Sequence, residues 1–193
     1  MVGFEHRDDA ERFWADLRAR LAEFCLELSA EKTRLIEFGR FAAERRQKRG
    51  LGRPETFSFL GFTHICTRDR KGRFKLKRIT DSKRMRAKLR AVNTEVRRRQ
   101  HLPIPEQGRW LASVLRGHCN YYAVPDNHEA IGAFRHQITR LWLKSLRRRS
   151  QRTKMTWERM TRLEKRWLPK TRVLHPWPNA RFDARTLGRS PVR

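Results

Sequence analysis

The sequence has little that would support a secreted or membrane-spanning protein. Its three cysteines, Cys25, Cys66 and Cys119, are odd in number and far apart, which excludes a disulfide scaffold and a cysteine zinc site. No run of about 18 apolar residues occurs, so no membrane span is expected. The first residues, Met1-Val2-Gly3-Phe4-Glu5-His6, lack the apolar stretch of a secretory signal. These absences predict a cytoplasmic protein with no membrane partner.

Acidic side chains are also scarce, and they form no recognisable active site. Asp8-Asp9 is the only adjacent carboxylate pair, and its place at a predicted helix start favours capping over metal binding. No glycine-rich phosphate loop, GxSxG or HExxH pattern occurs. His118, Cys119 and His128 match no established zinc spacing, so packing is the preferred interpretation for them. The sequence therefore predicts no catalytic residue, no cofactor and no metal site.

Positive charge is abundant and unevenly distributed. The chain holds 47 Lys and Arg against 20 Asp and Glu, a net charge of +27. Residues 1–60 hold 12 of the basic and 11 of the acidic residues, which leaves 35 and 9, net +26, for residues 61–193. Such a segment repels itself unless a polyanion neutralises it, and counterion release makes nucleic acid the obvious partner. A merely soluble basic surface is the alternative, although common domains carry single-digit net charge.

Hydrophobic patterning over the first 80 residues predicts an α+β unit. Apolar residues at three- and four-residue steps indicate a helix capped by Asp8 with one buried face, and Glu11 completes a capping-box-like start. Gly72 is expected to supply a positive φ to a hairpin turn at residues 68–72. The predicted elements are, in order, strand 2–4, helix 8–25, strand 32–38, helix 40–49, strand 56–67 and strand 74–79.

After residue 80 the apolar period becomes helical. Thr80 or Asp81 is expected to cap the first of four helices. The predicted helices cover residues 81–99, about 110–122, about 128–149 and about 157–167, and the last contains Trp157, Met160, Leu163 and Trp167. The proline-containing tail is expected to be irregular. The fold class is therefore α+β, with domains at residues 1–80 and 81–168 and a tail at residues 169–193.

Several separated motifs resemble one protein family. Val2-Gly3-Phe4 followed by a helix, the stretch from Leu26 to Leu35, and Phe59-Leu60-Gly61-Phe62 resemble the end of the palm of a group II intron-encoded reverse transcriptase. The stretch from Leu115 to Tyr122 resembles the core of that family's maturase-specific domain, also called domain X or the thumb. Leu141-Trp142 with its basic run, and His175-Pro176-Trp177-Pro178, resemble later parts of that domain. The resemblance covers nearly the whole chain and implies a truncated palm remnant followed by an all-α helical thumb.

The same resemblance also shows which motifs of the family are missing from these residues. The family's Tyr-Ala-Asp-Asp motif, expected just before Val2-Gly3-Phe4, and an earlier metal-binding aspartate do not occur, so no polymerase activity is expected of the chain alone. The resemblance implies binding of group II intron RNA, in support of folding and splicing, in the bacterial cytoplasm. A primer–template duplex is a further implied partner. Mg²⁺ is implied only if a catalytic palm completes the chain.

Two alternatives stay open. The chain could be the C-terminal part of an RNA-directed DNA polymerase, with a separate or upstream reverse-transcriptase chain supplying the catalytic aspartates. It could also be a mobile-element remnant that has no function as a separate protein.

The predicted RNA-binding residues are mainly cations on helix faces, because phosphate contacts give affinity while shape and unpaired bases give RNA specificity. Tyr121 is expected to stack on a base, unless it or Tyr122 belongs to the core. Asn120 fixes a helix end or contacts RNA. Gly61 either admits a nucleic acid or packs within a strand. The full set is Lys75, Lys77, Arg78, Arg86, Arg90, Arg97, Arg116, Asn120, Tyr121, Arg140, Lys144, Arg147 and Arg148.

Overall fold

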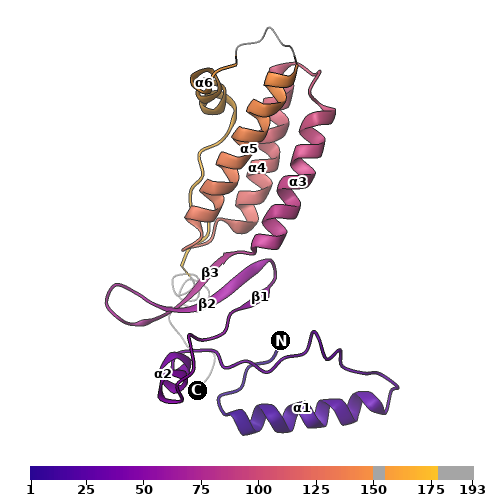
Figure 1. Ribbon diagram of the computed structural model, residues 1–193, viewed down its shortest axis with the longest axis vertical. Coiled ribbons are helices and arrows are strands. Elements are labelled where there is room, and N and C mark those ends of the chain that lie inside the picture. Colours follow the sequence, from indigo (N-terminus) through magenta and orange to yellow (C-terminus); the bar gives the residue numbers. More distant parts are fainter. Residues whose placement is uncertain (150–154, 178–193) are drawn as a thin grey trace, which may run out of the picture. The chain divides into compact units, whose positions relative to one another are not determined.

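The fold combines helices with one small sheet, as a computed structural model of residues 1–149 and 155–177 describes it (Figure 1). The described residues form six helices and one three-stranded sheet, so the α+β fold class is confirmed. The chain divides into two compact units, Met1–Glu55 and Thr56–Arg193, here called unit 1 and unit 2. The sheet belongs to the same unit as the helices that follow it. The domain boundary near residue 80 stays a prediction.

Unit 1 contains two helices and no strand. The helices are α1 (Arg7–Ala22) and α2 (Ala42–Lys48). The strands predicted at residues 2–4 and 32–38 are wrong, because neither stretch has a partner strand within the unit to complete its backbone hydrogen bonds. The prediction that Asp8 caps the first helix is also wrong. His6 is the N-cap residue and makes no side-chain capping bond, while Asp8 lies inside the first turn, near the positive end of the helix dipole.

Unit 1 buries very little apolar surface. Ala10 and Ala42 are the only buried apolar residues among residues 1–55. The buried face predicted for the first helix is reduced to Ala10, since no second layer within the unit covers it: Phe13 is 38% exposed and Phe24 is 61% exposed. Further along the unit, Phe41 is 54% exposed. Apolar side chains thus remain largely uncovered within this unit.

The sheet of unit 2 is an antiparallel meander in the order β1-β2-β3. Its strands are β1 (Phe57–Phe59), β2 (Phe62–Arg68) and β3 (Phe74–Thr80). The single strand predicted at residues 56–67 is therefore two strands. Leu60 and Gly61 connect them with φ of +48° and +79°, the pair of positive values that a two-residue hairpin turn of type I′ requires. Gly72 has a φ of +77° in the second turn, as predicted.

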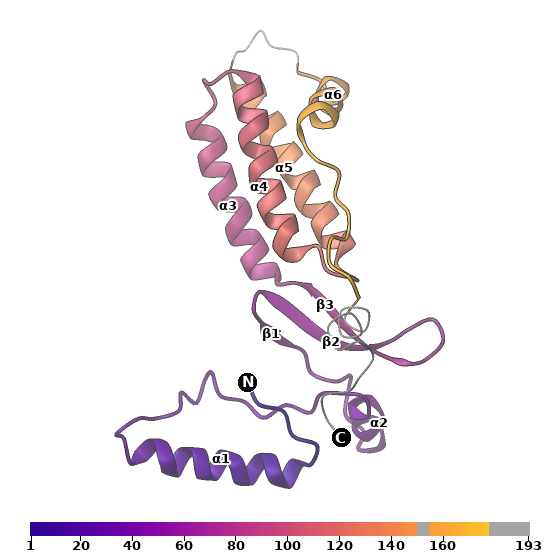
Figure 2. The same ribbon diagram turned by 180° about the vertical axis from the view of Figure 1, so that it is seen from behind.

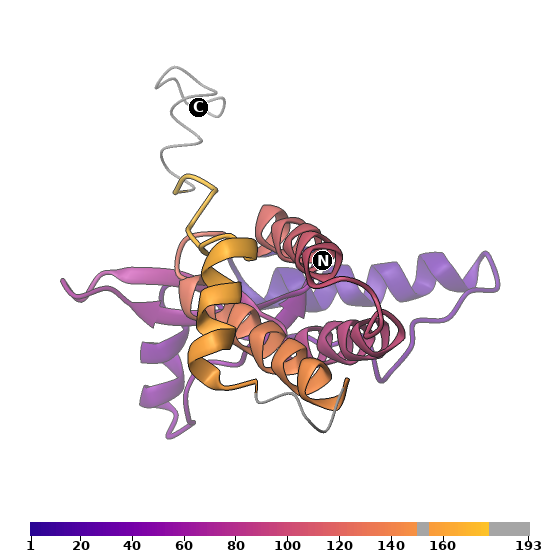
Figure 3. The same ribbon diagram turned by 90° about the horizontal axis from the view of Figure 1, so that it is seen from above.

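Four helices follow the sheet, as the apolar period predicts. They are α3 (Ser82–Arg98), α4 (Ile104–Tyr122), α5 (His128–Arg148) and α6 (Trp157–Trp167). Asp81 caps α3, because its carboxylate accepts hydrogen bonds from the backbone N–H groups of Lys83 and Arg84. Figure 2 shows α3, α4 and α5 running side by side. In the view along the bundle, α6 lies beside α5, and it also packs against α4 (Figure 3).

The core of unit 2 lies between these helices and contains a few buried amides. Its fully buried side chains include Leu111, Ile138 and Trp142. The indole of Trp142 donates to Gln107 Oε1 at 2.9 Å, and Gln107 Nε2 donates to the carbonyl of Leu102 at 2.9 Å. This amide therefore joins α5 to the turn between α3 and α4.

The shortest helix of unit 2, α6, packs one side on the core. Met160 is fully buried, and Leu163 and Trp167 pack against the core. Trp157 is 42% exposed. As the first residue of α6, it lies against His136 at the edge of the bundle, with ring centroids 5.7 Å apart.

Asn127 joins the sheet to the helices. It is fully buried between α4 and α5, and its Oδ1 accepts a hydrogen bond from the backbone N–H of Thr80 at 2.8 Å. Its Nδ2 donates to Thr80 Oγ1 and to the carbonyl of Tyr122, both at 2.8 Å. Because one side chain satisfies polar groups at the end of β3 and the end of α4, the sheet and the bundle form one unit.

Candidate nucleic-acid interface

Three of the motifs that carry the family resemblance meet at the C-terminal end of α4. The hydroxyl of Tyr121 donates to the carbonyl of Leu60 at 2.7 Å, and its ring stacks on Phe62 at a centroid distance of 5.7 Å. On another side, His175 Nε2 lies 2.7 Å from the carbonyl oxygen of Asn120. We call this cluster the motif junction, and its members are Leu60, Gly61, Phe62, Asn120, Tyr121, Tyr122 and His175.

The two tyrosines of the motif junction have different environments. Tyr122 is partly buried and packs against the core, and burial raises the pKa of its hydroxyl. A Cβ at Gly61 would lie 2.7 Å from that hydroxyl oxygen, so Tyr122 occupies the space that glycine leaves. Turn geometry and this close approach therefore explain Gly61 without a bound nucleic acid. Tyr121 is 49% exposed, so part of its ring is accessible although its hydroxyl is held.

The predicted hairpin cations do not form one patch. Lys75 is neutralised within the molecule, since its Nζ lies 2.6 Å from Asp126 Oδ1 and 4.8 Å from the ring centroid of Trp177. Lys77 lies on the same face of β3 as Lys75, whereas Arg78 lies on the opposite face because side chains alternate along a strand. Burial first, and the charge of Arg78 in addition, lower the pKa of the cross-strand His64.

The first continuous cationic surface lies on α3. Arg86, Arg90 and Arg97 are spaced by 4 and 7 residues, which places them on one side of the helix, and all three are exposed. The buried residues Val92 and Val96 lie on a different side, toward the core. Among the described residues, none of the three arginines makes an ion pair. We call this surface the α3 arginine face.

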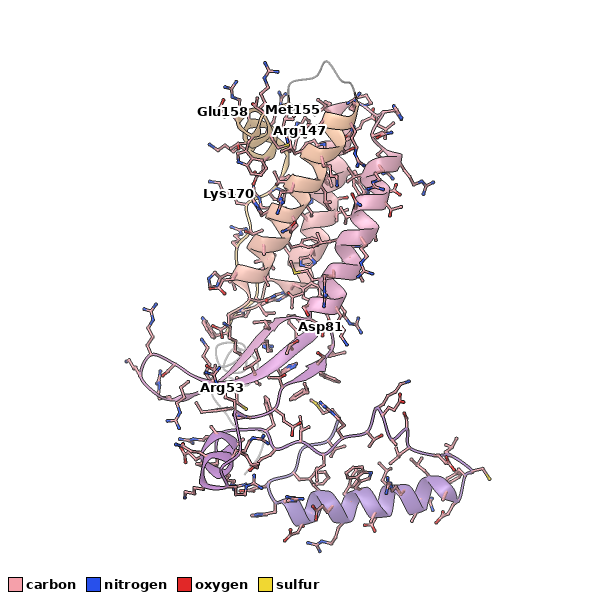
Figure 4. All side chains as sticks on the ribbon, in the orientation of Figure 1. Arg53, Asp81, Arg147, Met155, Glu158 and Lys170 are labelled. Carbon is pink, nitrogen blue, oxygen red and sulfur yellow. The ribbon has the colours of Figure 1, made fainter. Side chains whose placement is uncertain are left out.

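A second cationic surface lies on α5. Arg140, Lys144, Arg147 and Arg148 follow the spacing i, i+4, i+7 and i+8, and all four are exposed on the side opposite the buried Trp142. Arg147 also donates from Nε to the carbonyl of Met155 at 2.9 Å, and Figure 4 shows these two residues side by side at the end of the bundle. We call this surface the α5 cationic face.

The residues of α4 predicted for RNA binding are exposed in the C-terminal half of that helix. Arg116 and Asn120 lie one turn apart on its solvent side, and Tyr121 follows. The structure thus gathers most of the predicted set into two helix faces and the motif junction. The residues outside these groups are Lys75, Lys77, Arg78 and Arg116.

The described acids of unit 2 that form ion pairs do so with cations outside the two faces. Asp69 pairs with Arg73 at 2.9 Å, and Glu95 pairs with Arg99 at 2.7 Å. Glu164 forms an ion pair with Arg135. Because the α3 arginine face and the α5 cationic face have no carboxylate partners in the described chain, their charge remains available to a polyanion.

The sequence analysis missed a groove between α3 and α4. Arg84 and Lys88 from α3 and His118 from α4 are among its lining residues. His118 was predicted to pack, and it lies within the stretch that resembles the maturase-specific domain. The signal that could have found the groove is the pair Arg84 and Lys88, one turn apart on α3, together with Gly117 within a predicted helix.

The described residues contain no cluster of candidate metal ligands. Over residues 1–149 and 155–177, no three His, Cys, Asp or Glu side chains gather where they could hold a metal ion. In the same residues, no helix has the length and apolar content needed to cross a bilayer. Comparison of the chain with models of protein families, with curated proteins and with solved structures finds no match.

Proposed function

We propose that this chain binds a structured RNA through the α3 arginine face and the α5 cationic face. The observation that carries the proposal is the exposure of seven Lys and Arg side chains on two helix faces with no carboxylate partner among the described residues. Arg86 and Arg97 are 11 residues apart in α3, a distance of about 16 Å along a helix that rises 1.5 Å per residue. This length covers several successive phosphates of a nucleic-acid strand.

The family resemblance makes the RNA more specific. We propose that the partner is a group II intron RNA in the bacterial cytoplasm, which the chain helps to fold and splice while catalysis belongs to the RNA. A primer–template duplex is a second ligand of the same surfaces. Supporting this proposal, the motifs around Gly61, Tyr121 and His175 contact one another although they lie far apart in the chain. These contacts give a structural reason for the presence of all three motifs in one chain.

The proposal is tested by removing three charges from the α3 arginine face. Arg86→Gln, Arg90→Gln and Arg97→Gln in one full-length variant should weaken binding to a structured intron RNA. If each arginine neutralises one phosphate, the slope of log K against log salt should fall by about 2 to 3, since each contact contributes about 0.7–0.9. The measurement is RNA affinity over a series of salt concentrations.

A matched control removes the same charge from α1. Arg7, Arg12 and Arg20 are exposed and pair with neighbouring carboxylates on that helix or at its end, so their replacement by Gln should leave the salt slope close to that of wild type. Equal losses of affinity and slope in the two triple variants would contradict the proposal, because they would show that only total charge matters.

A second function is favoured by the uncovered apolar residues of unit 1. Phe24, Leu26 and Phe41 are each more than half exposed, which suits association with another chain. That chain would carry the Tyr-Ala-Asp-Asp segment, and together they would form an RNA-directed DNA polymerase. An upstream reading frame that ends in this segment favours such an assembly. A genome without that frame favours RNA binding alone or a non-functional remnant.

A further inference from the structure

The groove between α3 and α4 has the dimensions of a ligand site. Its volume is about 600 Å³, within the range of about 300–1,000 Å³ that is usual for small-molecule sites. Both helices contribute apolar and polar side chains to it. The residues that matter for its chemistry are Arg84, Met85, Lys88, Gly117, His118 and Tyr122.

The cations of the groove are distinct from the α3 arginine face. Arg84 and Lys88 lie one turn apart and are exposed. Helical periodicity places them on the flank of α3 that faces α4, whereas Arg86 and Arg90 lie on the other flank. Neither Arg84 nor Lys88 forms an ion pair with a described residue. The groove therefore has its own uncompensated positive charge.

His118 contributes a buried polar edge to the groove. Its side chain is only 7% exposed and stacks on Phe134, with ring centroids 3.7 Å apart. Its Nε2 has no hydrogen-bond partner among the described residues. Burial, and then the charge of Lys88, lower the pKa of His118 to about 4, so the ring is neutral at physiological pH. The neutral ring thus lines the groove as an aromatic surface, while the nitrogen itself is shielded from solvent.

Gly117 keeps the groove open between the cations and the histidine. It lies within α4, where glycine is less favourable than alanine. A Cβ at this position would meet no atom within 4 Å. Neither backbone strain nor close packing therefore requires glycine at this position, and the missing side chain leaves open space in the groove.

We propose that this groove takes one unpaired nucleotide of the bound RNA, with its phosphate on Arg84 and Lys88 and its base in the groove beside His118. Charge complementarity favours this occupant, because two unpaired cations adjoin an apolar and aromatic interior. Unpaired, splayed bases are also the features by which proteins recognise RNA sequence. The inference rests on the proposed function, since the nucleotide belongs to the same RNA.

The test fills the groove and leaves both cationic faces unchanged. Gly117→Leu places a side chain in open space, and Gly132→Leu in α5 is the matched control because its Cβ position is open as well. The probes are two RNA hairpins with the same stem, one fully paired and one with a single-nucleotide bulge. Wild type should bind the bulged hairpin about tenfold more tightly, the effect expected of one stacked base. Gly117→Leu should lose this preference and keep the affinity for the paired stem, while Gly132→Leu keeps both.

The outcomes separate this inference from the proposed function. Equal affinity of wild type for the two hairpins, or an undiminished preference in Gly117→Leu, would overturn the nucleotide site while RNA binding stands. Failure of wild type to bind either hairpin would overturn RNA binding and the site together. If Gly117→Leu does not fold, the surface variant Arg84→Gln with Lys88→Gln serves instead and should weaken binding of the bulged hairpin selectively.

Discussion

Replacing Asn127 with alanine should loosen the sheet from the helical bundle. The fully buried amide makes three hydrogen bonds of 2.8 Å, two with Thr80 and one with Tyr122. Its loss leaves the backbone N–H of Thr80 without a partner, at about 1–3 kcal/mol. The carbonyl of Tyr122 loses one bond but keeps the bond from the backbone N–H of Val124 at 2.8 Å. We therefore expect the free energy of unfolding to fall by about 1–4 kcal/mol. A typical domain has only about 5–15 kcal/mol in total, so the effect should be plain.

The assay is urea unfolding of the full chain, followed by circular dichroism. Thr80→Val removes only the hydroxyl partner, so a double-mutant cycle with Asn127→Ala should give a coupling energy of about 0.5–3 kcal/mol. Asn120→Ala is the control, because that asparagine is exposed, and it should change stability by less than about 0.5 kcal/mol.

The result that would refute this reasoning is an Asn127→Ala protein that unfolds at the urea midpoint of wild type. Strict additivity of Asn127→Ala and Thr80→Val would also count against a direct bond between the two side chains. In either case the sheet would have to be held on the bundle by other contacts, such as those of Tyr121 with Leu60 and of Lys75 with Asp126.

Two further predictions concern α6 and pH. Gly108→Ala brings a methyl group to about 2.5 Å from Trp167 Cγ, so α6 must shift from α4. We expect a loss of about 1–3 kcal/mol in the free energy of unfolding and altered tryptophan fluorescence. The control is Gly117→Ala in open space of the same helix, which should lose no stability and gain up to about 1 kcal/mol. The pKa of His118 falls from 6.5 to about 4 on folding, so the unfolded chain takes up a proton first and stability is lost as pH drops between these values. His118→Phe should flatten that part of a plot of thermal midpoint against pH, and an equally steep plot in the variant would contradict the assignment.

The helices of unit 2 could be predicted because their signals are local. Met85, Leu89, Val92 and Val96 recur at helical spacing, and Asp81 is a residue type that caps helices, so both the buried side and the start of α3 followed from the residues. The same periodicity indicated which cations of α3 and α5 face solvent. Local patterns are sufficient to predict a helix when it exposes one side and buries the other.

The strands were less predictable because they depend on partners. The alternating residues 32–38 carry the pattern of a strand, yet no partner strand lies within their unit. The tight turn at Leu60 and Gly61 was hidden within an apolar run, since leucine seldom adopts a positive φ. Strand formation is a property of two segments, and one segment alone does not reveal it.

Long-range contacts are the part of the candidate site that could not be predicted from the sequence. Lys75 was expected to be free for RNA, but its ion pair with Asp126 joins residues 51 positions apart. No sequence pattern pointed to Asn127, although its side chain joins the sheet to the bundle. The groove beside His118 also depends on the separation of two helices, which the pattern of Arg84, Lys88 and Gly117 does not determine by itself.

Residues near the end of the described chain complete the structure around β3. The backbone N–H of Leu174 donates to the carbonyl of Ala123 at 2.9 Å, and Trp177 covers the ammonium group of Lys75. During synthesis, α3, α4 and α5 form their local contacts before this segment leaves the ribosome. The contact of Lys75 with Trp177 forms only after about 100 further residues have been synthesised. The nascent chain therefore presents a more exposed ammonium group on its hairpin than the finished protein does.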